Sequence, residues 1–172
     1  MNSSTSSKPE EGPQPFYDPA NYKREDNVGL LMRSIILSLL TRVDRRLESH
    51  GLTHAQWAPL YLMSRCHGIT LAELSRELRI DAGALTRTLD RLEAKGLCHR
   101  ERSTQDRRVV HLMLTPAGVE ASAPVPAVLC EALNAYLDGF SRDEWQTLLG
   151  LLRRMQANVQ ALDAADDEPS KR

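Results

Sequence analysis

Residues 81–118 read DAGALTRTLDRLEAKGLCHRERSTQDRRVVHLMLTPAG, and halfway along them the spacing of apolar residues changes from helical to extended. The first half begins with Asp81, whose side chain can cap a helix N-terminus, and ends at Gly96, which favours a helix C-terminus. The inward-facing positions of this helix are Leu85, Leu89 and Leu92. Their spacing of four and three residues places them on one face, so the opposite face is predicted to lie open.

The second half of this stretch has the pattern of a β-hairpin. Residues 97–102 (LCHRER) and 109–114 (VVHLML) are compatible with strands, and the polar STQDRR between them favours a turn. Thr115 and Pro116 then open another helix, because proline is tolerated in a first turn. We therefore expect a helix followed by a hairpin that carries arginines at its tip.

Two further helices are expected before this stretch. One runs from a cap at Thr53 to about Cys66, and Pro59 inside it predicts either a distortion or a later start. The other covers LAELSREL, residues 71–78, whose leucines are spaced by three and four residues after a break at Gly68. A short helix, a turn and a second helix form the helix-turn-helix arrangement, which lays its second helix in the major groove of DNA.

The two ends of the patterned region carry apolar faces that one small domain does not cover. A first helix, capped by Asp26 or Asn27, reaches about Ser49, and Ser141 caps a last helix. The two apolar stripes of the first helix are Val28, Leu31 and Ile35, and Ile36, Leu40, Val43 and Leu47. The apolar seam of the last helix is Leu148, Leu152, Met155, Val159 and Leu162. Such faces predict that each of these helices packs against a partner helix.

The open face of the predicted recognition helix combines small residues with arginines. Arg87 is long enough to reach a guanine edge, and Arg91 can contact a phosphate. Alternatively, both arginines pair on the surface with Asp90 and Glu93. In the Asp-Arg-Arg turn of residues 106–108, the carboxylate can hold one arginine while the other enters the minor groove.

Taken together, these segments resemble the MarR (multiple antibiotic resistance regulator) family of transcription factors over residues 27–162. The resemblance rests on GLTHAQW, LAELSREL, the Leu-Glu-x-Lys-Gly-Leu run, the Asp-Arg-Arg wing and the Leu-Thr-Pro-x-Gly opening of the next helix. Two departures stand out. Gly83 and Ala84 replace polar or proline residues, so base readout would depend on the arginine of that helix. Pro124 and Pro126 break a helix that is usually continuous.

The resemblance implies a mainly α fold with a small β-hairpin wing, that is, a winged helix-turn-helix plus a helical dimerisation region in an obligate homodimer. Residues 53–114 would form the DNA-binding domain, and residues 25–52 and 115–163 the dimerisation helices. Residues 1–24, rich in Ser, Pro and Glu, would be a flexible arm, and residues 164–172 an acidic tail.

The resemblance also implies a function: a transcriptional regulator, in most cases a repressor, that a small aromatic acid releases from a pseudo-palindromic operator. The residues expected to contact double-stranded DNA are Ser75, Gly83, Ala84, Thr86, Arg87, Arg91, Asp106, Arg107 and Arg108. Those expected to bind an aromatic carboxylate are Arg33, His50, Trp57, Tyr61 and His67. The alternatives are a place in the core for Trp57 and Tyr61, and an ion pair between subunits for Arg33.

The composition is consistent with such a regulator. The chain has 172 residues, of which 41% are hydrophobic, 26% charged and 5% aromatic, as in one globular domain richer in helix than in strand. Residues 65–111 contain ten Lys or Arg against seven Asp or Glu, a basic balance that suits a polyanionic partner. No signal peptide and no apolar run of membrane-spanning length are found, so we expect a cytoplasmic protein without membrane contact, metal or cofactor.

Three cysteines leave one alternative function open. Cys66, Cys98 and Cys130 form no CxxC pair, but a redox-sensing regulator of the same fold needs only one reactive thiol. Cys98, beside His99 and Arg100, is the candidate, although its place in a strand predicts burial. An enzyme is not expected, because HExxH, GxSxG and a Gly-rich phosphate loop are absent. A helical adaptor would explain the apolar seam but not the arginines of the hairpin.

Overall fold

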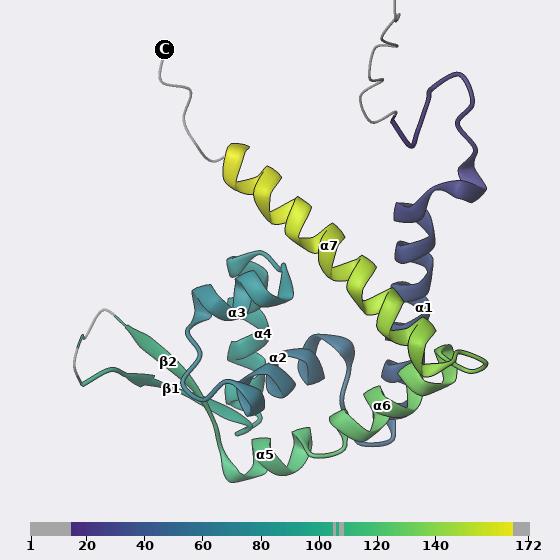
Figure 1. Ribbon diagram of the computed structural model, residues 1–172. Helices are drawn as coiled ribbons and strands as arrows, with labels where there is room; N and C mark the ends of the chain where they lie inside the picture. The colour runs from purple at the N-terminus through teal and green to yellow at the C-terminus, as the bar shows by residue number, and fades with distance from the viewer. Residues whose placement is uncertain (1–14, 105, 107–108, 167–172) are drawn as a thin grey trace, which may run out of the picture. The chain divides into compact units, whose positions relative to one another are not determined.

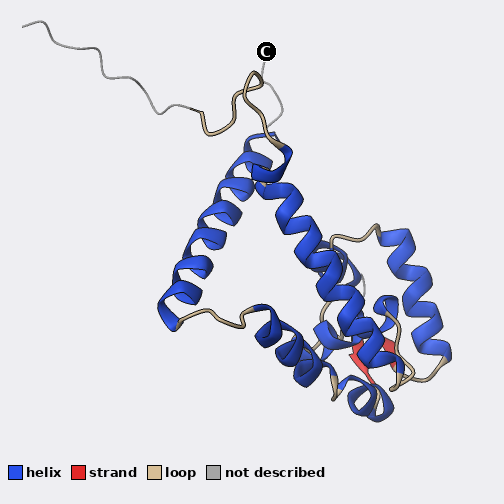
Figure 2. Ribbon diagram, turned by 90° about the vertical axis from the view of Figure 1, so that its right-hand side faces the viewer, coloured by secondary structure: helices blue, strands red, loops and turns tan. Residues whose placement is uncertain are grey.

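The computed structural model describes residues 15–104, 106 and 109–166 (Figure 1). The helices in chain order are the 3-10 turn η1 (Arg24–Asp26), α1 (Val28–Glu48), α2 (His54–Arg65), α3 (Leu71–Leu78), α4 (Ala82–Ala94), α5 (Pro116–Ser122), α6 (Val125–Tyr136) and α7 (Arg142–Asp166). The strands β1 (Cys98–Arg102) and β2 (Val110–Leu114) lie between α4 and α5. The predicted fold class is confirmed, since the described residues are mainly helical and contain one two-stranded sheet (Figure 2).

The chain divides into two units, residues 1–38 and 39–172. In the first unit, the amide of Leu30 donates a hydrogen bond to Asn27 Oδ1 (2.8 Å), so Asn27 is the predicted cap that α1 uses. The hydroxyl of Tyr17 accepts a further hydrogen bond from the first amide of α1 (3.1 Å). A side chain distant in sequence therefore satisfies one of the amides that a helix start leaves without a partner.

In the second unit, a leucine-rich core lies between the helices and the hairpin. The largest fully buried side chains include Leu47, Leu60, Met63, Leu74, Leu85, Leu89, Leu92 and Leu112. They come from α1, α2, α3, α4 and β2, and full burial of each contributes about 2 kcal/mol to folding. The three leucines of α4 are buried as their spacing predicts, which fixes how this helix is turned toward the core.

Capping residues determine where the central helices begin. α2 starts at His54, where the Thr53 amide donates to Gln56 Oε1 (3.2 Å), and the helix continues through Pro59. The later start predicted from Pro59 is therefore wrong. Pro59 lacks one helical donor, but its ring is buried in the core, and this burial offsets the lost hydrogen bond. α4 begins as predicted, because Asp81 Oδ1 accepts from an amide of its first turn (3.0 Å).

The hairpin is joined to the helices at its base. β1 and β2 pair in antiparallel register, with Cys98 opposite Leu114. The amide of Leu112 donates to the carbonyl of Ile69 (2.9 Å), which lies in the predicted extended link between α2 and α3. The link thus pairs with β2 as a short extended segment at the edge of the sheet. A backbone hydrogen bond therefore connects the wing to the helix-turn-helix.

The helix that Pro116 opens stops at Ser122, and α6 starts afresh at Val125. The interruption predicted from Pro124 and Pro126 is therefore confirmed. Both prolines lie at the start of α6, where the missing amide hydrogen costs nothing because no earlier carbonyl is available to it.

Apolar side chains are exposed on α7, in the second unit, and on the first half of α1, in the first unit. α7 has no buried residue, and along its predicted seam Leu152 is 37% and Leu162 66% exposed. On α1, Val28, Leu31, Ile35 and Ile36 are exposed as well. Among the described residues, no helix has both the length and the apolar composition that crossing a bilayer requires.

Candidate nucleic-acid interface

α4 buries its leucines and leaves its other face open. The residues of this open face are Gly83, Ala84, Thr86, Arg87 and Arg91, of which Ala84 and Thr86 are half-buried and the rest exposed. A Cβ at Gly83 would approach Asp81 Oδ1 to 3.1 Å. Glycine at this position therefore leaves room for the Asp81 side chain that caps the helix. It also adds no side chain to the open face of α4.

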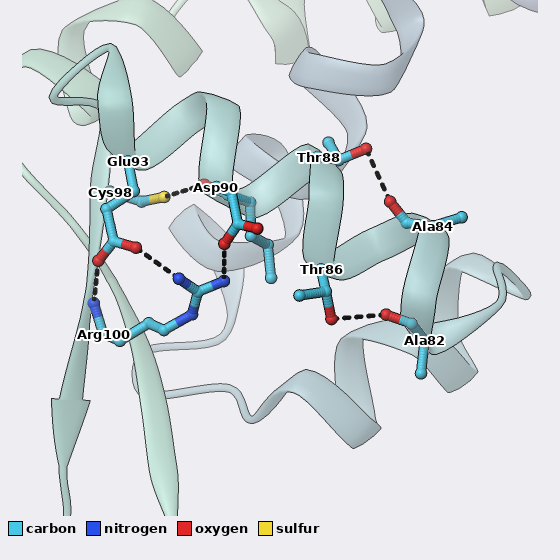
Figure 3. Close-up of polar contacts among 9 residues, drawn as sticks. Ala82, Ala84, Thr86, Thr88, Asp90, Glu93, Cys98 and Arg100 are labelled. Atoms are coloured by element: carbon cyan, nitrogen blue, oxygen red, sulfur yellow. Dashed lines mark hydrogen bonds and ion pairs between the residues drawn. The ribbon is translucent and has the colours of Figure 1, made fainter.

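Two hydroxyl groups expected to contact DNA, which would bind its phosphates, donate their protons within the chain. Thr86 Oγ1 donates to the carbonyl of Ala82 (2.7 Å; Figure 3), and Ser75 Oγ donates to the carbonyl of Ile80 (2.7 Å). A phosphate oxygen only accepts hydrogen bonds, and each hydroxyl has a single proton to give. A phosphate contact from Thr86 or Ser75 therefore requires the side chain to rotate away from its present acceptor.

The two carboxylates of α4 both bind Arg100, on the neighbouring strand β1. Figure 3 shows the guanidinium between them: Nη2 lies 2.7 Å from Asp90 Oδ1, and Nη1 lies 2.5 Å from Glu93 Oε2. The backbone amide of Arg100 also donates to Glu93 Oε1 (3.1 Å). The hydrogen bond to Asp90 and the charge of Glu93 hold the pKa of Arg100 above its ordinary value.

The alternative pairing of the α4 arginines with these carboxylates is therefore not formed. Within the described residues, neither Arg87 nor Arg91 has a carboxylate partner, and both side chains are exposed. Sequence reasoning missed Arg100, because it treated Asp90 and Glu93 only as partners within their own helix. The available signal is their spacing of three residues, which puts both carboxylates on one side of α4, toward whatever element packs there.

The tip of the wing is only partly described. Arg107 and Arg108 lie outside the described residues, so the predicted pairing within the Asp-Arg-Arg turn stays a prediction. The amide of Val109 donates to the carbonyl of Asp106 (2.9 Å), and the amide of Asp106 donates to Ser103 Oγ (3.3 Å). These two hydrogen bonds link Asp106 to the described residues on either side of it, Ser103 and Val109.

The residues expected to bind a ligand are distributed over several places. Trp57 is 5% exposed, and its Nε1 donates to Asp44 Oδ1 (2.7 Å), so its polar edge is already satisfied. Tyr61 is half-buried against the same core. His50 and His67 are exposed beyond the ends of α1 and α2, and in the described part of the chain no hydrogen bond or ring contact joins either to Trp57 or Tyr61.

Asp44 and His54 complete an arrangement around Trp57 that sequence reasoning missed. The His54 ring stands edge-on to the indole with 5.2 Å between ring centroids, and its Nδ1 lies 3.6 Å from Asp44 Oδ1. Asp44 thus joins the end of α1 to the start of α2. No local sequence pattern marks it, because the three residues meet only when the two helices pack.

Arg33, the remaining ligand candidate, lies in the first unit. It lines an open groove of about 600 Å³ formed by η1 and the first half of α1. The other lining residues are Arg24, Glu25, Leu30, Leu31, Ser34 and Leu37. Two guanidinium groups beside leucine side chains can bind an anion that also has an apolar part.

Cys98, the candidate redox cysteine, is neither exposed nor easily ionised. Cys98 is 4% exposed, and desolvation together with the nearby Glu93 carboxylate raises the pKa of its thiol to about 11. A redox-sensing thiol is exposed and has a lowered pKa. Cys66 and Cys130 are exposed. Among the described residues, no cluster of His, Cys, Asp or Glu is arranged to hold a metal ion.

Comparisons with known proteins agree with this geometry. A model of the MarR family matches residues 52–110. Among solved structures, the transcriptional regulator PA3341 is 30% identical, with a TM-score of 0.74 over 78% of this chain and 99% of that one. A MarR-family regulator from Silicibacter pomeroyi is 26% identical, with a TM-score of 0.73 over 83% and 97%. A mutant MarR from E. coli, complexed with operator DNA, is 29% identical, with a TM-score of 0.66 over 74% and 92%.

Proposed function

The chain belongs to the MarR family of DNA-binding transcriptional regulators and is not an enzyme, and from this membership we propose that it works as a homodimer on a pseudo-palindromic operator. Each copy would place α4 in the major groove and the hairpin tip in the minor groove. The related E. coli MarR in complex with operator DNA supports this reading. Two copies related by a two-fold axis would read half-sites about 10 bp apart.

One observation carries the proposal: Arg87 and Arg91 project from the open face of α4 without a carboxylate partner among the described residues. An arginine that is not engaged within the chain can give both of its parallel N–H groups to a guanine edge. In this proposal Arg87 reads a base, Arg91 binds a phosphate, and Arg107 enters the minor groove. The exposed apolar faces of α1 and α7 would pair with those of the second copy.

The proposal is tested by selecting genomic DNA fragments with the purified full-length protein. We expect enrichment of a two-fold symmetric motif, and Arg87→Ala to weaken its binding by about 5- to 150-fold and to relax the sequence preference at one base pair. Arg107→Ala should weaken binding to the same motif. Arg45→Gln, which removes a charge from the exposed surface of α1, is the control and should bind as wild type. A wild-type protein that enriches no symmetric motif at low salt would contradict the proposal.

We also propose that the protein represses its target genes in the cytoplasm and that a small aromatic carboxylate releases it. The groove lined by Arg24 and Arg33 supports an anionic ligand with an apolar ring. Benzoate or nicotinate should then bind to the DNA-free protein in calorimetry and reduce operator affinity, and Arg33→Gln should abolish both effects while leaving operator binding without ligand intact. Because the linkage is reciprocal, operator DNA should weaken the binding of the acid by the same factor.

A further inference from the structure

We propose that Arg100 is a positioning residue for DNA recognition: it neutralises the carboxylates of Asp90 and Glu93 and thereby keeps Arg87 and Arg91 available to DNA. This inference rests on the proposed function, in which the open face of α4 contacts the operator. Arg100 itself is not required to touch DNA. It acts through the two carboxylates that it holds.

The geometry satisfies both carboxylates with one side chain. The guanidinium has two donor groups directed to separate partners, at 2.7 Å from Asp90 Oδ1 and 2.5 Å from Glu93 Oε2 (Figure 3). Glu93 is bound a second time, by the backbone amide of Arg100 (3.1 Å). A planar fork of fixed donors suits this double contact, whereas a lysine ammonium would reach one carboxylate as a point charge.

The spacing within α4 explains what would happen without Arg100. Asp90 follows Arg87 by three residues, and charged side chains at this spacing on a helix surface attract one another. With Arg100 absent, the cation of α4 that lies at this spacing from Asp90 is Arg87, the residue proposed to read the base. An arginine held by a carboxylate has to break that contact before it binds a guanine, and the cost lowers affinity for DNA.

The charges of Asp90 and Glu93 also affect DNA affinity directly, because in the proposed complex they lie close to the phosphates. The side chains of Asp90 and Glu93 are 57% and 36% exposed, so solvent and nearby phosphates feel their charge. If both carboxylates lost their cation, α4 would approach the operator with a local charge more negative by one unit. Repulsion from phosphates grows at low salt, and the number of counterions released on binding would fall.

The contact has a second consequence for the shape of the interface. Arg100 lies on β1, ten residues after Asp90, so the same ion pairs tie the wing strand to the recognition helix. If Arg100 acts only by tying β1 to α4, removing the two carboxylates together with the arginine should weaken DNA binding as much as removing the arginine alone. If it acts by neutralising the carboxylates, removing all three charges should restore DNA binding.

The experiment measures operator affinity and its salt dependence for four full-length variants beside wild type. For Arg100→Gln we expect about a tenfold loss of affinity at low salt, and a slope of log K against log salt that is smaller in magnitude than that of wild type. In the triple variant Asp90→Asn, Glu93→Gln, Arg100→Gln, no carboxylate remains to hold Arg87, so we expect wild-type affinity or tighter. Arg100→Lys should lie between wild type and Arg100→Gln, and the surface control Arg45→Gln should match wild type.

A double-mutant cycle gives an independent readout. Arg87→Ala should cost less affinity in the Arg100→Gln background than in wild type, because Arg87 is already engaged by Asp90 there. Equal costs in both backgrounds would overturn the inference. So would a triple variant as weak as Arg100→Gln, which would leave only the mechanical tie, or an Arg100→Gln protein that binds like wild type.

The controls separate this inference from the proposed function. If the wild-type protein binds no operator, the proposed function is contradicted. If the wild-type protein binds its operator and Arg100→Gln leaves that affinity unchanged, only the role of Arg100 is contradicted. Thermal unfolding of each variant shows whether it is folded under the binding conditions. The triple variant retains no unpaired charge at this place, so even if Arg100→Gln alone is unstable, a folded triple variant that binds more weakly than wild type contradicts the inference.

Discussion

At Gly118, in the first turn of α5, the backbone lies so close to the backbone of Leu97, the residue before β1, that no side chain fits. A Cβ built at Gly118 would lie 1.8 Å from the carbonyl oxygen of Leu97. That oxygen accepts a hydrogen bond from the amide of Thr115 (3.1 Å), so it cannot move away without losing a partner. This glycine, part of the Leu-Thr-Pro-x-Gly motif, is therefore required by close packing of backbone against backbone.

We expect Gly118→Ala to lower the free energy of unfolding by about 3 kcal/mol, because the methyl group forces the backbone of α5 away from Leu97. Gly150→Ala is the matched control, since a Cβ there meets nothing within 4 Å and the residue lies off the apolar seam of α7. The control should be neutral or more stable by up to about 1 kcal/mol. Denaturant unfolding of both variants at one protein concentration measures the difference, and equal stabilities would refute this account of Gly118.

Burial of Cys98 predicts a thiol that does not react in the native protein. Because its pKa is raised to about 11, only about one thiol in a thousand is ionised at pH 8, and the side chain is out of contact with solvent. Mass spectrometry after brief treatment with iodoacetamide should find Cys66 modified and Cys98 intact, whereas in denaturant both should be modified. Rapid native modification of Cys98 with loss of DNA binding would instead favour a redox switch.

At the scale of elements, the start of α3 depends on a reciprocal pair of side chains. Glu73 Oε2 accepts hydrogen bonds from the amide and the hydroxyl of Thr70, both at 2.8 Å, while the Glu73 amide donates to Thr70 Oγ1 (3.3 Å). These bonds to Thr70 hold the pKa of Glu73 below its ordinary value of 4.5. A capping box of this kind explains why a helix as short as α3 has a definite first residue.

The lowered pKa gives the cap a defined pH dependence. The folded state binds the proton of Glu73 more weakly than the unfolded state, so the stabilisation is complete above pH 4.5 and is lost as pH falls through the folded value. The stability difference between wild type and Glu73→Gln should therefore be largest near pH 6 and shrink below pH 4.5. Thermal unfolding at several pH values measures it, with Glu77→Gln on the same helix as control. A difference that does not change with pH would contradict the role assigned to the ionised carboxylate.

At the scale of the whole molecule, the exposed apolar seam of α7 predicts the oligomeric state. A surface of leucine, methionine and valine at heptad spacing is stable when a second helix covers it. Light scattering on the wild type should give about twice the chain mass of 19.3 kDa. Leu152→Glu should reduce it to the mass of one chain, because a charge in the seam is costly to bury.

Ala157→Glu provides the control for this prediction. It adds the same charge to the same helix, but residue 157 lies midway between the seam positions 155 and 159 and is turned away from them. The control should remain at the mass of the dimer and should bind DNA. If both variants remain dimeric, the seam of α7 is not the dimer contact.

How far the sequence predicts this molecule depends on whether an interaction lies within one element or between two. Asp81, the leucines of α4 and Pro124 are read correctly from the printed residues, because caps, helical spacing and proline act over one or two turns of chain. The combination of helix-turn-helix, hairpin and Leu-Thr-Pro-x-Gly then identifies the family, and the open face of α4 follows from the same spacing.

Only the tertiary structure decided which partners the polar side chains have. Arg100 binds Asp90 and Glu93, Asp44 binds Trp57, and Pro59 remains in α2 because the core covers its ring. Each of these contacts joins two elements or depends on burial by a neighbouring one. The spacing of residues along the chain does not encode distances between elements, and the choice among several nearby carboxylates is made by packing.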